Sequence, residues 1–366
     1  EDILAALGCH GEDSIFPAHP RFERVANLIP TPDAERILEA LLASPSRRLL
    51  AHGAGGVGKT STVLSLPTHR PHGRWIFYDC FGGGTYKDSP GDERHSVRRA
   101  LLQLSNQLAV ESGSPFLIRP PDSKDDIWRA FRSRLDCAAQ ILKAQGQSLF
   151  LVIDAADNAI QAADTPKDSF IVDMWKVQLP ENVFLLMTAR SGGRAQSLQA
   201  PPDTPQLELT GFDQEASTQH LRLKHPSATD NDARVFHDYS HGNPRVQTYA
   251  LNTGANADIS IVLEHARRKL DEIFQDYIEG ALTLRFSKGL ASEHLDDLSC
   301  FPRPLRLEHL TEVFGLPSTE LEALCNALSP GLVRSPDGWR FRDEDFDTFL
   351  RIRLENSSGV TSAHLR

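Results

Sequence analysis

The sequence predicts an α/β fold in which a parallel sheet is followed by a helical domain and a winged-helix domain. Between residues 48 and 212, short apolar runs alternate with helical stretches, as in a parallel sheet covered by helices on both faces. The pattern becomes helical after Phe212, and near the end three helices precede a hairpin. These changes give four expected parts: an N-terminal segment and helix at 1–45, a sheet domain at 46–212, a helical lid domain at 213–285 and a winged helix at 286–366.

The length and composition of the chain suit a multidomain protein of the cytoplasm. It has 366 residues and a net charge of −10, which is long for one core and argues weakly against general nucleic-acid binding. No apolar run could span a bilayer, and the five cysteines are too widely spaced for a disulfide framework. None of the 14 histidines has the spacing of a metal site. The acidic start lacks an initiator Met, which favours a piece of a longer protein.

The first expected element is a helix that begins after Thr31. Prolines interrupt the preceding thirty residues. Thr31 is a typical N-cap, Pro32 suits the first turn, and Asp33 complements the positive end of the helix. Apolar residues at helical spacing from Ile37 to Leu42 give this helix a buried face.

The segment from Gly53 to Thr60 fits the phosphate-loop pattern G-x-x-x-x-G-K-[ST] at every defined position. An apolar strand precedes it and a helix follows, which is the context in which this motif binds nucleotide phosphates. Lys59 would reach the β- and γ-phosphates, and the Thr60 hydroxyl would ligate Mg²⁺. The expected phosphate contacts are Gly53, Ala54, Gly55, Gly56, Val57, Gly58, Lys59, Thr60 and Ser61.

Five strands are expected in the sheet domain, at 48–52, 75–80, 149–154, 183–188 and 207–210. Two helical stretches between Ser96 and Leu142 carry the chain over the sheet. The second strand lies between the phosphate-loop strand and the strand that ends in Asp154. Such an extra strand separates ATPases of the additional-strand class from nucleotide kinases and small GTPases.

Three charged residues follow these strands at the edge where open α/β sheets bind ligands. Asp154 ends the third strand and would hold Mg²⁺ opposite Thr60. Asp157 lies three residues further on, and both acids could instead cap the next helix. Arg190 could donate charge-assisted hydrogen bonds to a terminal phosphate, or be an ordinary surface arginine. With Lys59, these are the candidate catalytic residues.

The expected elements after Phe212 are helices and one hairpin. The helices are expected at 214–223, from Asp230 or Asn231, at 244–251, from Ile259 to roughly Ile278, and at 293–299, 307–314, 319–328 and 343–354. The hairpin pairs 332–334 with 339–341 around a Pro-Asp-Gly turn. The basic triplet at 267–269 is interpreted as the solvated face of the long helix.

Together these motifs resemble the STAND family, the signal-transduction ATPases that include the NACHT and NB-ARC modules of innate-immune receptors. The resemblance covers most of residues 30–354. It rests on GAGGVGKT at 53–60, LVIDAAD at 151–157, TAR at 188–190, LTGFDQEA at 209–216, GNP at 242–244 and the winged helix. The stretches at 79–85 and 154–158 are most similar to bacterial antiviral members.

The resemblance implies an ATP/ADP switch that needs Mg²⁺. ADP holds the module closed. Exchange for ATP opens it, so that it oligomerises with copies of itself and activates an N-terminal effector, usually restrained by a C-terminal sensor. Both flanking parts are expected to be absent from this sequence. Position by position, Arg190 would sense the terminal phosphate, Pro244 would close over the base or ribose, and Ile29 and Pro30 would line the adenine.

Three positions depart from the family pattern. Asn158 stands where many members have Glu, and Asn cannot act as a general base, so either Asp157 polarises the attacking water or hydrolysis is very slow. Thr31 stands where relatives often have Arg. Arg342 or Asp343 falls where the winged helix of the family contacts the ADP β-phosphate through a His-Asp pair, but the histidine is missing.

The rival interpretation is a DNA-associated ATPase related to origin-recognition proteins, which share the winged helix. The helix before the wing would enter a major groove, yet 318–328 contains two acids and no Lys or Arg, which disfavours phosphate contacts. Arg334 and Arg340 in the wing are too few to compensate. The sequence therefore predicts a switch with weak ATPase activity, no membrane association and no direct DNA binding.

Overall fold

The chain forms two units in a computed structural model. The first comprises Glu1–Gly82 and Asp92–Ala216, and the second Gly83–Gly91 and Ser217–Arg366. The structure describes residues 6, 11–22, 28–84, 93–119, 121–165, 168–252, 258–287, 289–295, 297–298, 301, 304–329, 331–335, 338–342 and 344–358. Among these residues, no helix is both long and apolar enough to cross a membrane.

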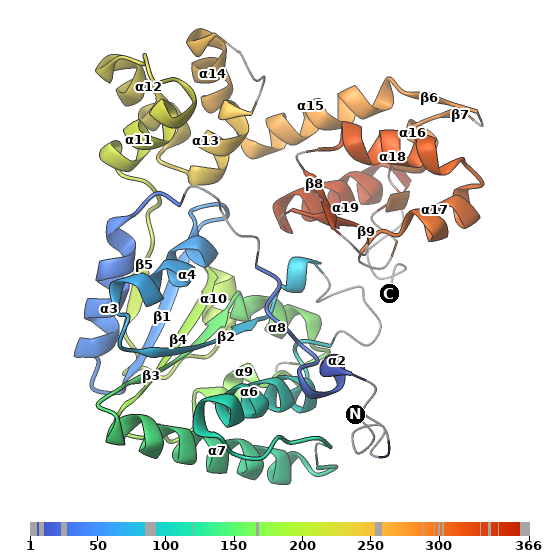
Figure 1. Ribbon diagram of the computed structural model, residues 1–366. Helices are drawn as coiled ribbons and strands as arrows, with labels where there is room; N and C mark the ends of the chain where they lie inside the picture. Colours follow the sequence, from blue (N-terminus) through green and yellow to red (C-terminus); the bar gives the residue numbers. More distant parts are fainter. Residues whose placement is uncertain are drawn as a thin grey trace. The chain divides into compact units, whose positions relative to one another are not determined.

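The first unit is built on a sheet of five parallel strands in the order β2-β3-β4-β1-β5 (Figure 1). They are β1 (Arg48–Gly53), β2 (Arg74–Asp79), β3 (Leu149–Asp154), β4 (Val183–Arg190) and β5 (Gln206–Glu208). All five expected strands are present. A strand does separate the phosphate-loop strand from the strand ending in Asp154, but it is β4. The expectation that the strand at 75–80 lies between them is wrong, because this strand, β2, lies at the edge of the sheet next to β3. The order of strands along the chain does not fix their order in the sheet, since a crossover connection can place the next strand on either side of the previous one.

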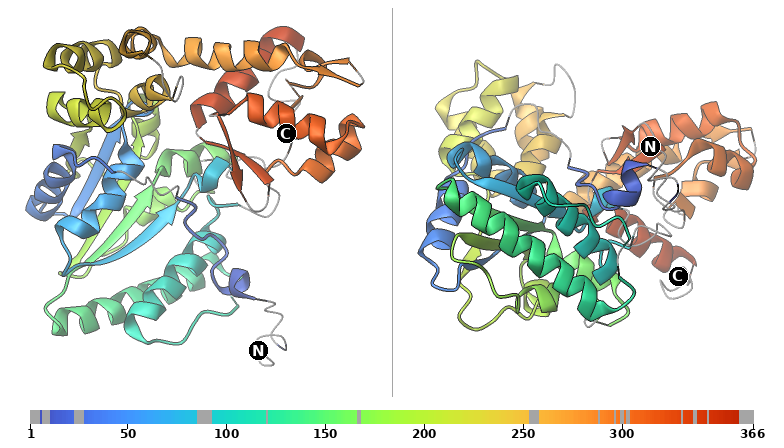
Figure 2. Two further views of the ribbon diagram at one scale, coloured as in Figure 1. Left: turned by 45° about the horizontal axis from the view of Figure 1, so that its top comes forward. Right: turned by 60° about the horizontal axis from the view of Figure 1, so that its bottom comes forward.

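Helices cover both faces of this sheet. On one face lie α6 (Val97–Ser112) and α7 (Lys124–Ala144), and on the other α3 (Pro32–Ala43) and α4 (Lys59–His69), as the turned views also show (Figure 2). Short helical elements complete the unit: α2 (Glu12–Ile15), α8 (Ala156–Ala162), α9 (Ile171–Met174) and α10 (Gly193–Ser197). The short helix η1 (Gly82–Gly84) spans the boundary at which the chain passes into the second unit.

The inner strand β3 shows why the sequence of a buried parallel strand is a continuous apolar run. Leu149, Leu151 and Ile153 enter the core beneath α6 and α7, whereas Phe150 and Val152 enter the core beneath α3 and α4. Alternate side chains of a strand point to opposite faces, so burial on both faces requires apolar residues at every position. The strand can then deliver its one acid, Asp154, only at its end.

Four helices at the start of the second unit share one core. They are α11 (Gln214–Lys224), α12 (Asp230–Ser240), α13 (Pro244–Leu251) and α14 (Ile259–Ala266). The expected single helix from Ile259 to Ile278 is wrong, because α15 (Leu270–Leu282) starts anew. Glu272 accepts the backbone N–H of Lys269 at 3.1 Å, and this capping contact begins α15. Arg268, expected on a solvated helix face, lies in the break and forms an ion pair with Asp276.

The end of the chain forms the expected helices and hairpin. Its elements are β6 (Arg285–Phe286), β7 (Gly289–Leu290), α16 (Ser292–Leu295), α17 (Leu307–Phe314), α18 (Ser318–Ala327), β8 (Leu332–Ser335), β9 (Gly338–Phe341) and α19 (Glu344–Ser358). Leu305 pairs with Trp339 beside the β8–β9 hairpin, which completes a winged-helix arrangement. Phe274 of α15 packs into its core. Asp343, the turn residues 336–337 and part of the expected helix 293–299 lie outside the described residues.

Candidate functional site

The phosphate loop joins β1 to α4, and its glycines are required by its geometry. Gly56 and Gly58 have φ of 77° and 92°, values that side chains with a Cβ disfavour. A Cβ on Gly53 would lie 2.8 Å from Val57 Cγ2 and 2.9 Å from the Leu209 carbonyl oxygen. Because α4 begins at Lys59, the positive end of this helix adjoins the loop, as a phosphate site requires.

Lys59 lies against the carbonyl groups of its own loop. Its Nζ donates to the carbonyl oxygens of Gly53 and Ala54, each at 2.9 Å. These contacts hold the ammonium group inside the turn of the loop. A phosphate bound there would compete with the two carbonyls for the same cation, which is the role expected of a phosphate-loop lysine.

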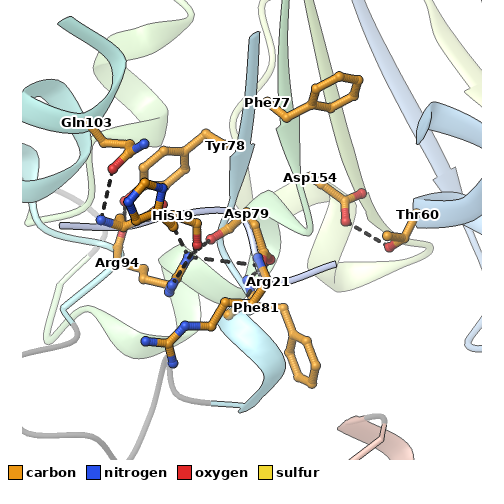
Figure 3. A network of polar contacts seen from close by, with 12 residues as sticks. His19, Arg21, Thr60, Phe77, Tyr78, Asp79, Phe81, Arg94, Gln103 and Asp154 are labelled. Atoms are coloured by element: carbon orange, nitrogen blue, oxygen red, sulfur yellow. Dashed lines mark hydrogen bonds and ion pairs between the residues drawn. The ribbon is translucent and has the colours of Figure 1, made fainter. Parts of the chain in front are cut away.

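Two hydroxyl groups hold Asp154. Thr60 Oγ1 donates to Oδ2 at 2.7 Å (Figure 3), and Thr188 Oγ1 donates to Oδ1 at 2.6 Å. Thr188 also accepts the backbone N–H of Ala155 at 2.8 Å, which fixes Ala155 in a left-handed conformation with φ of 53°. Burial raises the pKa of Asp154 to about 6, against the opposing effect of both hydroxyl hydrogen bonds.

The donor set at this position suits Mg²⁺. The Thr60 hydroxyl and the Asp154 carboxylate are hard oxygen ligands already in contact. Within the described ranges, no group of three or more His, Cys, Asp or Glu residues could hold a metal ion. The protein would thus supply two oxygens, and phosphates and water the rest, which is how Mg²⁺ usually binds in phosphoryl-transfer sites.

Asp157 lies in the first turn of α8 and is 2 % exposed. Its Oδ2 is 2.6 Å from Nε of Arg194, and a second nitrogen of Arg194 donates to Oδ1 of Asn158. Asp157 and Asn158 are therefore both in contact with one guanidinium group. Arg194 carries no sequence motif and was not among the predicted site residues.

Arg190 ends β4 directly opposite Gly53 in the strand register. The edge thus places Asp154, Thr188 and Arg190 on adjacent strands beside the phosphate loop. The next residue, Ser191, contacts Nδ1 of His52 through its Oγ at 3.0 Å. Thr188 was visible in the sequence only as the start of the TAR stretch, and its hydroxyl contact with Asp154 was not anticipated.

A second polar network occupies the end of β2, where Asp79 is opposite Asp154 in the register. Asp79 is buried and accepts the backbone N–H groups of Arg21, Phe81 and Gly82, each at 2.9 Å. Fully buried Arg94 donates to the carbonyl oxygen of Asp79 at 2.8 Å and to that of His19 at 3.0 Å (Figure 3). This network ties the segment around residues 18–21 to the sheet edge.

The remaining predicted residues have mainly local roles in the structure. Ile29 is buried and Pro30 exposed just before α3. Pro244 is the first residue of α13, which Asn243 caps by accepting the N–H of Arg245 at 3.0 Å. Arg342 follows β9, and its backbone N–H donates to the Gly331 carbonyl oxygen at 3.0 Å. Pro244 and Arg342 belong to the second unit, so their predicted nucleotide contacts stay predictions.

The loop after β1, the acid at the end of β3 and the intervening β4 define the architecture. The fold is that of a P-loop ATPase of the additional-strand class. No protein-family model matches the sequence, and no curated protein matches it.

Three solved structures illustrate the proteins whose chains follow a similar course. A Walker-type ATPase of Pyrococcus abyssi is 15 % identical with a TM-score of 0.48, over 91 % of this chain and 98 % of that chain. A STAND protein with a tetratricopeptide repeat sensor from Pyrococcus horikoshii is 14 % identical with a TM-score of 0.47, over 92 % of this chain and 44 % of that chain. The Aeropyrum pernix ORC1 protein, solved in complex with DNA, is 15 % identical with a TM-score of 0.40, over 91 % of this chain and 93 % of that chain.

Proposed function

We propose that this chain is the ATP/ADP-binding switch module of a STAND-type signal-transduction ATPase, akin to NACHT and NB-ARC modules and serving antiviral or innate-immune defence. ADP keeps it closed, and ATP lets it assemble with copies of itself to activate an effector elsewhere in the polypeptide. The observation that carries the proposal is the hydrogen bond from Thr60 to Asp154, which joins the phosphate loop and the acidic strand end in one site.

The residues of this edge have complementary roles in the proposal. Loop N–H groups and Lys59 bind the phosphates, and Arg190 contacts the terminal phosphate from β4. Thr60 and Asp154 hold Mg²⁺, which neutralises phosphate charge when bound. Thr188 orients Asp154 by holding its other oxygen. Hydrolysis is slow because Asn158 is not a base and Asp157 is paired with Arg194.

The switch needs more than one new contact to ATP. Moving a closed-to-open ratio from 99:1 to 1:99 requires about 5.5 kcal/mol of differential binding. A charge-assisted hydrogen bond contributes about 1.5–3 kcal/mol, so Arg190 alone is insufficient. Neighbouring copies or a sensor domain supply the remainder, and the isolated chain with ADP is expected to be monomeric.

The proposal also assigns nucleotide contacts to residues outside the sheet domain. In the closed state Ile29 and Pro30 line the adenine, Pro244 closes over the base or ribose, and Arg342 of the winged helix contacts ADP. We assign the protein to the cytoplasm, because the cysteines are widely spaced and Cys80, Cys137 and Cys325 are free thiols.

A DNA-associated ATPase of the origin-recognition type is the second candidate, and the winged-helix arrangement favours it. The charges oppose it. Arg334 of the wing pairs with Glu322 of α18 at 2.7 Å, so an acid of the helix that would enter the groove already pairs with this arginine. Turnover that DNA stimulates would favour this candidate over the switch.

The test is the nucleotide that the purified protein carries. Denaturing it and separating the supernatant by anion exchange should recover ADP from the wild type and none from Lys59→Ala. Lys143→Ala is the matched control, because Lys143 is exposed and pairs only with Glu181 in the described structure. Native mass spectrometry should show monomers with ADP and assemblies with a non-hydrolysable ATP analogue. A folded protein with no bound nucleotide and no thermal shift with ATP or ADP would refute the proposal.

A further inference from the structure

Arg194 lies where the chain leaves the nucleotide edge. Three residues separate it from Arg190, and Gly192, with φ of 74°, turns the chain into α10. This turn directs Arg194 against α8, where Nε reaches Asp157 Oδ2 at 2.6 Å. The side chain of Arg194 is 21 % exposed and that of Asp157 is 2 % exposed. The pair is therefore largely withdrawn from water, and screening by solvent is weak.

This contact opposes the chemistry that hydrolysis requires. A general base must accept a proton from the attacking water, but Oδ2 of Asp157 is already in contact with the guanidinium group of Arg194. The same guanidinium group binds Asn158, whose amide is not a base. The side chains of Asp157 and Asn158 on α8 are thereby both held by one guanidinium group.

We propose that Arg194 is a positioning residue that restrains ATP hydrolysis by holding Asp157 in this ion pair, so that the ATP-bound state is long-lived. The inference rests on the proposed function and adds a regulation of the same site. Arg194 acts through Asp157 and does not touch the nucleotide. Release of Asp157 permits the hydrolytic step. The water oxygen bonds to the γ-phosphorus, the bond to the β–γ bridging oxygen breaks with its electron pair leaving on ADP, and Asp157 takes the water proton.

A purely architectural pair is the competing explanation. An acid in the first turn of a helix is stabilised by the helix dipole, and Asp157 with Arg194 also joins α8 to α10. Such a role predicts changes in stability after substitution, without a gain in the rate of hydrolysis. The two explanations therefore differ in the direction of the rate change.

The experiment is a double-mutant cycle on the full chain, with Arg194→Gln, Asp157→Asn and the double variant. Steady-state hydrolysis of Mg²⁺-ATP is followed over a range of ATP concentrations. Arg194→Gln should raise kcat roughly tenfold or more, a fraction of the 10²–10⁴-fold that a positioned general base contributes, and leave KM unchanged. In the Asp157→Asn background the same substitution should give no gain. Arg194→Lys, which keeps the cation but not the planar fork, should lie between Arg194→Gln and the wild type.

Arg129→Gln is the matched control, because Arg129 also pairs with an acid at 2.6 Å, but on the exposed surface of α7. It should not change the rate. Equal or slower hydrolysis in Arg194→Gln with ATP bound would overturn the inference, as would a gain that persists without Asp157. If Arg194→Gln does not fold, the hydrolysis rate of Arg194→Lys is compared with that of the wild type instead. Equal rates would overturn the inference.

Thermal melting of the same four proteins without nucleotide tests the ion pair itself. The melting temperature of the double variant should fall by less than the sum of the two single effects. Additive effects would show that the two side chains do not interact and would overturn the inference even if no ATP bound. Failure of the wild type to retain any nucleotide is a different result, since it refutes the proposed function.

Discussion

Asp79 and Asp154 end neighbouring strands opposite one another, and each is 2 % exposed, yet their partners differ in kind. Asp154 accepts hydrogen bonds from the hydroxyls of two threonines. Asp79 accepts three backbone N–H groups. A hydroxyl can rotate and offer its lone pairs to a metal ion instead, whereas a backbone amide is fixed by the fold. One acid is therefore suited to ligand binding and its neighbour to holding structure.

The largest expected difference concerns stability without nucleotide. Asp79→Ala leaves one buried and two partly buried N–H groups without their acceptor, and a buried unsatisfied group costs about 1–3 kcal/mol. We expect the free energy of unfolding in urea to fall by about 3 kcal/mol or more. Asp126→Ala on the surface of α7 is the control and should cost little. A loss below about 1 kcal/mol for Asp79→Ala would contradict the assigned structural role.

The opposite result is expected at Asp154, the acid on the neighbouring strand. Asp154→Asn removes a buried charge whose pKa is already raised to about 6 by burial, so nucleotide-free stability should be unchanged or higher. The affinity for Mg²⁺-ADP should fall about tenfold or more, about 1.4 kcal/mol, and the affinity for ADP in EDTA should fall much less. Titration calorimetry in the two buffers measures both. A destabilisation as large as that of Asp79→Ala would erase the contrast between the two acids.

A smaller effect is expected at Thr188, which holds Asp154 through one hydroxyl. Thr188→Val keeps the shape but loses the hydrogen bonds to Asp154 and to the Ala155 N–H, a cost of about 1 kcal/mol. Thr188→Ser keeps the hydroxyl and should behave like the wild type. Chemical unfolding and Mg²⁺-ADP affinity are compared across the pair. Equal behaviour of the Ser and Val variants would show that the hydroxyl is dispensable.

The smallest expected effect is a pH dependence of stability in the second unit. The titratable group concerned is the partly buried His220, and its partner is the side-chain amide of Gln247. His220 contacts Oε1 of Gln247 through Nδ1 at 3.0 Å, and burial lowers the pKa of His220 below 6.5, with the contact to Gln247 acting in the opposite direction. The unfolded state then binds protons more readily, so stability should fall as the pH drops below about 6.5. His220→Gln should lessen the loss of melting temperature between pH 7.5 and 5.5. His69→Gln, at an exposed position, should leave that loss as it is.

Local sequence signals were sufficient for the elements that bear the chemistry. The glycines of the phosphate loop, the apolar run of β3 and the Pro32 start of α3 act over a few residues, and each lies where expected. The break before α15 was missed, because the helical periodicity continues through it and only the capping contact of Glu272 reveals it. The strand order was missed for a similar reason, since it depends on how crossovers pack and not on any single strand.

The sequence by itself determined the phosphate loop and the acid that ends β3, because backbone turns and strand burial are set by neighbouring residues. Only the tertiary structure decided what surrounds each charged group. It gave Asp154 two exchangeable hydroxyls, gave Asp79 three fixed amides, and set Arg194 against Asp157. The physical reason is that these partners come from separate elements of the fold. The stability and the reactivity of a buried charged group depend on the groups that folding brings next to it.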